Sequence, residues 1–203
     1  MNGLKMLLIP AFEIGLWNAW ILMLYVISYN MLPYVLSSRR IIDEDIIKKA
    51  SHPDIGLTKS QKKLLVILNV TFFIPIIYSI FLPLKLGTVW FYVGSTIYSL
   101  GVVIGTIAAF NFFTTPVDRP VTKGVYRISR NPIYLSMFLI FIGTGIACVS
   151  WIFLLLAIVF LILSHILVNS EESFCLQKYG NSYREYMNTT QRWIGILKSG
   201  EKR

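Results

Sequence analysis

The chain has 203 residues, of which 55% are hydrophobic, and a formal net charge of +9. This content excludes an ordinary soluble domain, because several apolar stretches exceed the roughly 18 residues that mark a membrane-spanning helix. The positive charge does not indicate nucleic-acid binding, because the basic residues alternate with acidic ones and lie beside the apolar stretches. We therefore predict an all-α, polytopic integral membrane protein that contacts membrane lipids and no nucleic acid.

Five membrane-spanning helices are predicted. The first lies within residues 6–36, and we expect a retained span rather than a signal peptide, because no small-residue cleavage site follows the apolar run. The second covers residues 64–84 and the third covers residues 88–112. Between the first two, residues 37–63 form a loop of mixed charge, in which a short helix is expected at residues 43–50.

The apolar stretch at residues 133–168 is too long for one span. A single helix of 36 residues would reach about 54 Å, against a hydrocarbon core of about 30 Å. Gly143, Gly145 and Ser150 lie near the middle of the stretch, so we predict two short antiparallel helices there. After this hairpin, residues 171–187 show the spacing of an amphipathic helix, weakened near its middle by a glycine.

The distribution of basic residues supports the hairpin. Among the 19 Lys and Arg residues, only Lys5 and Lys85 lie outside residues 37–63, residues 113–132 and the tail after residue 169. With the hairpin, these three segments share one side of the membrane, as the positive-inside rule requires. We therefore predict an N-terminus outside and a helical C-terminal tail in the cytosol.

The most informative polar segment precedes the hairpin and reads Gly-Val-Tyr-Arg-Ile-Ser-Arg-Asn-Pro-Ile-Tyr over residues 124–134. Arg127 and Arg130 offer planar guanidinium groups that bind carboxylates or phosphates. The same two residues could instead contact lipid phosphate, and Tyr126 and Tyr134 could belong to an aromatic belt at the membrane surface. Taken alone, the segment leaves both interpretations open.

Two adjacent carboxylates, Glu171 and Glu172, follow the hairpin. They repel each other and oppose the dipole of a helix that ends there, so membrane topology gives no reason for them. The hairpin brings them to the same side of the membrane as Arg130 and Tyr134. A buried carboxylate at this position needs a cationic partner, for which Arg130 is the natural candidate. Together these residues predict a polar site at the membrane surface.

Both segments together resemble the signature of the isoprenylcysteine carboxyl methyltransferase and phospholipid methyltransferase superfamily. The first block of that signature, Gly-x-Tyr-Arg-x-x-Arg-His/Asn-Pro-x-Tyr, is similar to residues 124–134. The resemblance covers residues 101–193, so we divide the chain into residues 1–100, with two spans and the start of the third, and a catalytic part, residues 101–203. The second block is similar to Glu171-Glu172, Tyr179-Gly180, Tyr183, Tyr186 and Arg192-Trp193, with Cys175 at the usual leucine position.

This resemblance implies a membrane methyltransferase that uses S-adenosylmethionine and accepts a lipophilic or prenylated substrate from the bilayer. We expect Glu171 or Glu172 to meet the cofactor's ammonium group, and Arg127 or backbone N–H groups its carboxylate. Arg130 is expected to orient a carboxylate acceptor. The expected catalytic residues are Arg130, Asn131, Tyr134, Glu171 and Glu172; the expected cofactor-binding residues are Lys123, Gly124, Val125, Tyr126, Arg127, Pro132, Tyr183 and Tyr186.

Asn131 departs from the commonest pattern of the superfamily, in which many members have His at this position. An amide cannot take up a proton at neutral pH, so a general base is not expected here. A carboxylate acceptor is already ionised and needs no base, whereas an amine acceptor must lose a proton. The sequence therefore leans toward O-methylation of a carboxylate, such as an isoprenylcysteine-like one, and leaves methylation of a lipid open.

Two further interpretations stay open. Membrane sterol reductases resemble this superfamily in their C-terminal half and use NADPH, although the tail here is short for a dinucleotide. The chain could also be a non-catalytic membrane protein that keeps the fold. No metal site is expected, because His52 and His165 are far apart and no cluster of Cys and His accompanies them. Gly101 and Gly105 predict close packing of the third span.

Overall fold

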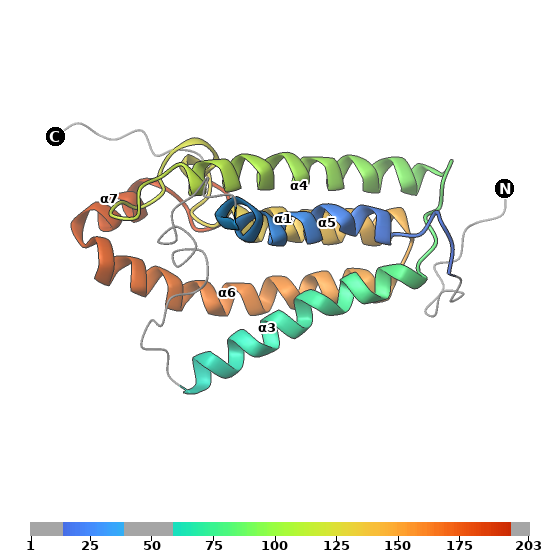
Figure 1. Ribbon diagram of the computed structural model, residues 1–203, viewed down its shortest axis with the longest axis horizontal. Coiled ribbons are helices and arrows are strands. Elements are labelled where there is room, and N and C mark those ends of the chain that lie inside the picture. Colours follow the sequence, from blue (N-terminus) through green and yellow to red (C-terminus); the bar gives the residue numbers. More distant parts are fainter. Residues whose placement is uncertain (1–13, 39–58, 196–203) are drawn as a thin grey trace.

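The computed structural model describes residues 14–38 and 59–195, and this part of the chain is built from helices and the loops that join them (Figure 1). The predicted all-α fold is therefore confirmed, while the helix predicted at residues 43–50 lies outside the described residues. Two short 3-10 helices, Ser79–Phe81 and Gly124–Arg127, interrupt the loops. The α-helices are α1 (Trp20–Ser38), α3 (Lys59–Tyr78), α4 (Val89–Phe113), α5 (Pro132–Ala147), α6 (Trp151–Tyr179) and α7 (Asn181–Thr189).

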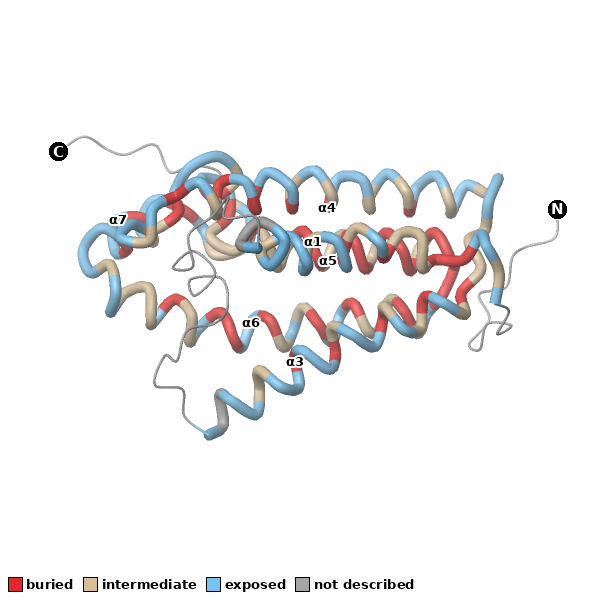
Figure 2. The backbone as a smooth tube through the Cα atoms, in the orientation of Figure 1, coloured by how far each residue is buried: buried red, intermediate tan, exposed pale blue. Residues whose placement is uncertain are grey.

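Three helical segments are long and apolar enough to cross a membrane, namely Lys62–Phe81, α4 and α6, and α1 and α5 are shorter apolar helices. The outward faces of these helices are exposed in the bundle, as the pale segments of α3 and α4 show (Figure 2). Ile77, Val103 and Phe110 are among the exposed apolar side chains on these faces. Lipid covers such faces in a bilayer. The predicted integral membrane protein is confirmed, with a helix at each predicted apolar segment.

Glycines allow α4 and α5 to pack against each other closely. A Cβ atom on Gly94 would overlap the backbone of Ala147, and one on Gly143 would lie 2.5 Å from the backbone nitrogen of Tyr98. A Cβ atom on Gly101 would lie 2.9 Å from the carbonyl oxygen of a residue in α5. Side chains at these positions would separate the two helices, so the close packing predicted for the third span is confirmed.

Helices α5 and α6 form the predicted hairpin. α5 ends at Ala147, three residues turn the chain, and the Ser150 side chain then accepts a hydrogen bond from the first turn of α6. The prediction of two short helices is wrong for α6, which has 29 residues. Nothing interrupts the helix until Gly180, whose φ of 56° ends it in the left-handed region. The helix predicted at residues 171–187 is consequently divided between α6 and α7.

The polar elements meet at one end of the bundle. The end of α4, the connector at residues 114–131, the start of α5, the end of α6 and α7 come together there (Figure 1). α3 packs against α6 near the opposite end and diverges from it toward this end (Figure 1). The hairpin therefore brings residues 124–134 and the two adjacent glutamates to the same end, as predicted. This polar end holds the candidate site.

Candidate active site

Glu172 is the centre of a buried ion-pair network. Its Oε1 atom accepts a hydrogen bond from Nε of Arg130 at 3.0 Å, and its Oε2 atom accepts one from Nη2 of Arg192 at 2.7 Å. Only 5% of the Glu172 side chain and 9% of the Arg130 side chain are exposed. Nη1 of Arg130 also donates to the carbonyl oxygens of Met187 and Thr190. We call Arg130, Glu172 and Arg192 the clamp, because they join the start of α5, the end of α6 and the segment after α7.

The C-terminal segment, residues 190–195, is bound to both helices of the hairpin. The backbone nitrogen of Arg130 donates to Gln191, and the Asn131 side chain donates to the Arg192 carbonyl oxygen at 3.2 Å. Trp193 extends this attachment along α6, because its indole nitrogen donates to Nδ1 of His165 at 3.0 Å. His165 is thus a hydrogen-bonded residue of α6. The C-terminal segment and the clamp together hold the elements of this end of the bundle in contact.

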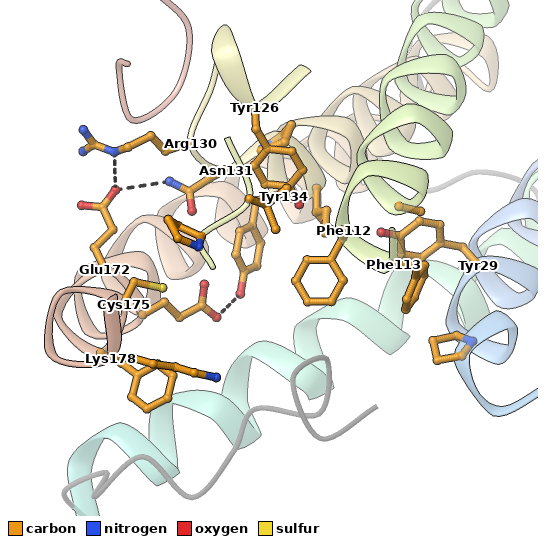
Figure 3. A pocket seen from close by; sticks show the side chains of 18 of the residues that line it. Tyr29, Phe112, Phe113, Tyr126, Arg130, Asn131, Tyr134, Glu172, Cys175 and Lys178 are labelled. Carbon is orange, nitrogen blue, oxygen red and sulfur yellow. Dashed lines mark hydrogen bonds and ion pairs between the residues drawn. The ribbon is translucent and has the colours of Figure 1, made fainter. Parts of the chain in front are cut away.

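Glu171 lies on a different face of α6 from Glu172. It accepts a 2.6 Å hydrogen bond from the Tyr134 hydroxyl, and it is less buried than its neighbour. Successive residues of an α-helix point about 100° apart, so two adjacent carboxylates of one helix enter different surroundings. Figure 3 shows both contacts: Arg130 and Asn131 on Glu172, and the separate hydrogen bond made by Tyr134.

A cavity of about 610 Å³ lies between the helices beside these polar groups. This volume lies within the range of about 300–1,000 Å³ that is usual for small-molecule sites. Its polar lining includes Arg130, Asn131, Tyr134, Glu171 and Glu172. Its remaining lining is mostly apolar or aromatic and comes from every apolar helix and the connector: Tyr29, Phe73, Phe112, Phe113, Tyr126, Pro132, Phe174, Tyr183 and Tyr186 are part of it. The cavity is therefore amphipathic.

Four of the predicted cofactor-binding residues do not line this cavity. Lys123 donates from its ammonium group to Thr114, and Arg127 is exposed. Gly124 adopts a φ of 58°, and a Cβ atom there would overlap the side-chain amide of Asn111, so glycine is required at this position. Val125 packs behind the cavity with the neighbouring aromatic residues. Their expected contact with a cofactor stays a prediction.

Residues 82–182 match the phospholipid methyltransferase family, and this stretch contains the whole segment 124–134 and both glutamates. Over these residues, the chain belongs to the phospholipid methyltransferase family. The superfamily that the two sequence blocks resemble is thereby confirmed. No curated protein matches the chain. Membership of this family indicates a membrane methyltransferase.

Three tyrosines form the wall behind the clamp, namely Tyr126 within the stretch that matches the family and Tyr183 and Tyr186 beyond it. The Tyr186 hydroxyl donates to the backbone oxygen of Tyr126 at 2.6 Å, and the Tyr183 and Tyr186 rings meet edge to face. Burial raises the pKa of Tyr126, Tyr183 and Tyr186 above the usual value for a phenol. These hydroxyls consequently stay protonated near neutral pH, where they can donate hydrogen bonds but cannot act as bases.

Sequence reasoning missed two features of the site. Arg192 was included in the resemblance but given no role, and its bond to Glu172 depends on the tail folding back beside α6. Lys178 was not considered, although it lines the cavity. The sequence does indicate that Lys178 shares a helix face with Glu171, because residues seven apart lie on nearly the same face of a helix.

Proposed function

We propose that this membrane methyltransferase uses S-adenosylmethionine to methylate a lipophilic acceptor in the cavity at the polar end of the bundle. The observation that carries this proposal is the amphipathic cavity, which has a carboxylate wall on α6 and apolar walls from the other helices. A polar cofactor and a lipid chain need opposite surroundings, and this cavity offers both. We further propose that this end faces the cytosol, in keeping with the positive-inside rule.

The residues present fit the cofactor. When bound, S-adenosylmethionine supplies an electrophilic methyl group on a sulfonium sulfur. Glu171 offers a carboxylate at the cavity wall for its ammonium group, and its orientation is fixed by the hydrogen bond from Tyr134. Glu172 is less suitable, because both of its oxygens are bonded to arginines of the clamp. The rings of Tyr126 and Tyr183 provide aromatic surface for an adenine.

Arg130 acts as a positioning residue in this proposal rather than as a contact to the acceptor. Its guanidinium binds Glu172 and the carbonyl oxygens of Met187 in α7 and Thr190 just after it, so its role is to hold the wall of the cavity in place. Rigid walls matter because methyl transfer is an in-line displacement, whose rate depends on how well the reacting atoms are aligned. The apolar walls exclude water from the reacting groups.

The nature of Asn131 favours a carboxylate acceptor. Its amide donates to the Arg192 carbonyl oxygen and offers no site that takes up a proton at neutral pH. An ionised carboxylate would need no base, because it has no proton to lose before it accepts the methyl group that a bound cofactor would supply. An isoprenylcysteine-like acceptor meets this requirement directly.

Cofactor binding provides the test. Calorimetry on the full chain in detergent should show binding of S-adenosylmethionine and of S-adenosylhomocysteine, and no comparable binding of NADPH. Glu171→Gln should weaken the binding of S-adenosylmethionine about tenfold, since a hydrogen bond to a charged group contributes about 1.5–3 kcal/mol. Glu185→Gln, at an exposed position of α7, serves as the matched control. Absence of binding at millimolar cofactor, or preferential binding of NADPH, would contradict the proposal.

A further inference from the structure

One face of α6 carries a row of three cavity-lining residues: Glu171, Cys175 and Lys178. Their spacing of four and then three residues places them above one another on a helix. Glu171 and Lys178 are about 10 Å apart along the helix axis, at a rise of about 1.5 Å per residue. The cavity wall therefore carries a carboxylate at one level and an ammonium group about two turns further toward the end of α6.

Lys178 differs from the other basic residue of the cavity in its partners. Arg130 is neutralised by Glu172. Lys178 forms no ion pair with a carboxylate in the described part of the chain; its ammonium lies 5.9 Å from the ring centre of Phe174 and 5.3 Å from that of Tyr179. Aromatic faces attract a cation but do not neutralise its charge. Lys178 can therefore bind an anion that enters the cavity.

The neighbours of Lys178 indicate which molecule carries this anion. Phe174 of α6 and Asn69 and Phe73 of α3 line the same cavity. α3 diverges from α6 at this end, and the close-up shows Lys178 at the edge of the site near α3 (Figure 3). Apolar walls beside a cation suit a lipid whose chain lies among the rings and whose head group carries the charge.

The cofactor is a less suitable partner for Lys178. The ammonium and carboxylate groups of its amino-acid part are attached to one carbon atom. If Glu171 binds that ammonium, as proposed above, the carboxylate is held close to Glu171 as well. Lys178 projects from the helix about two turns away, so its preferred anion belongs to the second molecule in the cavity.

We propose that Lys178 binds an anionic oxygen on the head of the acceptor and makes the enzyme specific for lipophilic acceptors whose head group carries such an oxygen. This proposal rests on the proposed function, since it needs a cavity shared by cofactor and acceptor. The shared chemistry is a carboxylate or a phosphodiester, as found on a lipidated cysteine or on a phospholipid respectively. Lys178 is then a specificity residue rather than a member of the clamp.

The test measures binding of three probes to the full chain in neutral detergent: N-acetyl-S-farnesylcysteine, dioleoyl phosphatidylethanolamine and the neutral lipid dioleoylglycerol. Lys178→Gln should weaken binding of the preferred one of the two probes with an anionic oxygen about tenfold, a factor typical of losing one charged contact. Dioleoylglycerol should be unaffected. Lys178→Arg should restore most of the affinity, and Arg184→Gln, which removes an exposed charge on α7, should change nothing.

Each outcome decides the proposal. Weaker binding of farnesylcysteine alone identifies a carboxylate acceptor, and weaker binding of phosphatidylethanolamine alone identifies a phospholipid. The proposal is overturned if wild-type protein binds neither farnesylcysteine nor phosphatidylethanolamine more tightly than dioleoylglycerol, or if Lys178→Gln leaves both affinities unchanged. It is also overturned if Lys178→Gln weakens the binding of S-adenosylmethionine and not that of a lipid probe. Failure of wild-type protein to bind S-adenosylmethionine at all would instead remove the proposed function.

Discussion

The two ends of the helical bundle are held together by different forces. At the end that contains the α5–α6 turn, α4 and α5 are in backbone contact at Gly94 and Gly143, and α3 packs against α6. At the polar end, α3 and α6 diverge and a cavity of about 610 Å³ opens between the helices. There the clamp and the C-terminal segment join the helices through directional polar contacts, beside a small cluster of buried residues that includes Tyr126 and Tyr183.

This difference separates the scaffold from the site. Close packing leaves no room for a ligand, so the chemistry can occupy only the end where packing is replaced by directional polar contacts. Such contacts stabilise a cavity without filling it. Substitutions at the two ends should therefore have different consequences: loss of the scaffold at one end, and loss of cavity geometry at the other.

The largest effect is expected from Glu172→Gln. Two buried or partly buried arginines lose their counter-charge, and breaking a buried pair typically costs about 3–5 kcal/mol. The thermal unfolding midpoint in detergent should fall by many degrees, and cofactor affinity should fall with it. Glu185→Gln, exposed on α7, should leave the midpoint unchanged. An unaltered midpoint for Glu172→Gln would mean that the clamp does not hold this end together.

Gly143→Ala should have the next largest effect, at the opposite end. The new methyl group would meet the backbone of α4 at Tyr98, and overpacking of this kind costs about 1–3 kcal/mol. We expect a lower unfolding midpoint but normal cofactor affinity in the protein that remains folded. Ser99→Ala, on the exposed face of α4, is the control. Weaker cofactor binding by folded Gly143→Ala protein would show that the two ends of the bundle are coupled.

Arg192→Gln should produce a smaller, local effect. The Arg192 side chain is 29% exposed, so its ion pair is partly screened and contributes about 1 kcal/mol or less. Hydrogen exchange should become faster at the amide of Gly195, which donates to Ile128 in the native structure. Amides of α4 should exchange as before. Unchanged protection of Gly195 would show that Arg192 does not hold the C-terminal segment.

The smallest effect at neutral pH concerns the tyrosines of the polar end. Burial raises the pKa of Tyr126, Tyr183 and Tyr186 above the phenol value near 10. The unfolded chain loses these protons first, so the stabilisation is complete below pH 10 and is lost as the pH rises above it. Unfolding midpoints should fall above pH 10, and less steeply in Tyr186→Phe. A flat profile up to pH 12 would contradict this.

Much of the fold follows from lengths and charges alone. A stretch of 36 apolar residues cannot cross a bilayer once, and the basic residues require its two ends on one side, so the hairpin is predictable. An ion pair between Arg130 and one of the two glutamates is also predictable, because a buried carboxylate needs a cation, whereas the choice of Glu172 over Glu171 depends on the rotation of α6. The length of α6 is less predictable, because apolarity ends near residue 168 whereas the helix ends only where Gly180 breaks it.

The composition of the cavity wall could not be derived from adjacency in the sequence. Arg127 belongs to the same motif as Arg130, and Lys123 directly precedes this motif, yet neither residue lines the cavity. Arg192 and Lys178, in contrast, contribute to the clamp and the cavity through tertiary folding and helix register. A motif identifies which segments matter, but the backbone path decides which of its side chains face the ligand.

The shortness of α5 sets the depth of the site. With 16 residues this helix is about 24 Å long, several ångströms less than a hydrocarbon core of about 30 Å. Its residues are buried or only partly exposed, so neighbouring helices rather than lipid cover most of it. The longer α6 continues past the start of α5, and its last turns form one side of the cavity. The cavity therefore lies beside the end of a helix that is shorter than a bilayer is wide, and an acceptor can enter it with its chain still among apolar walls.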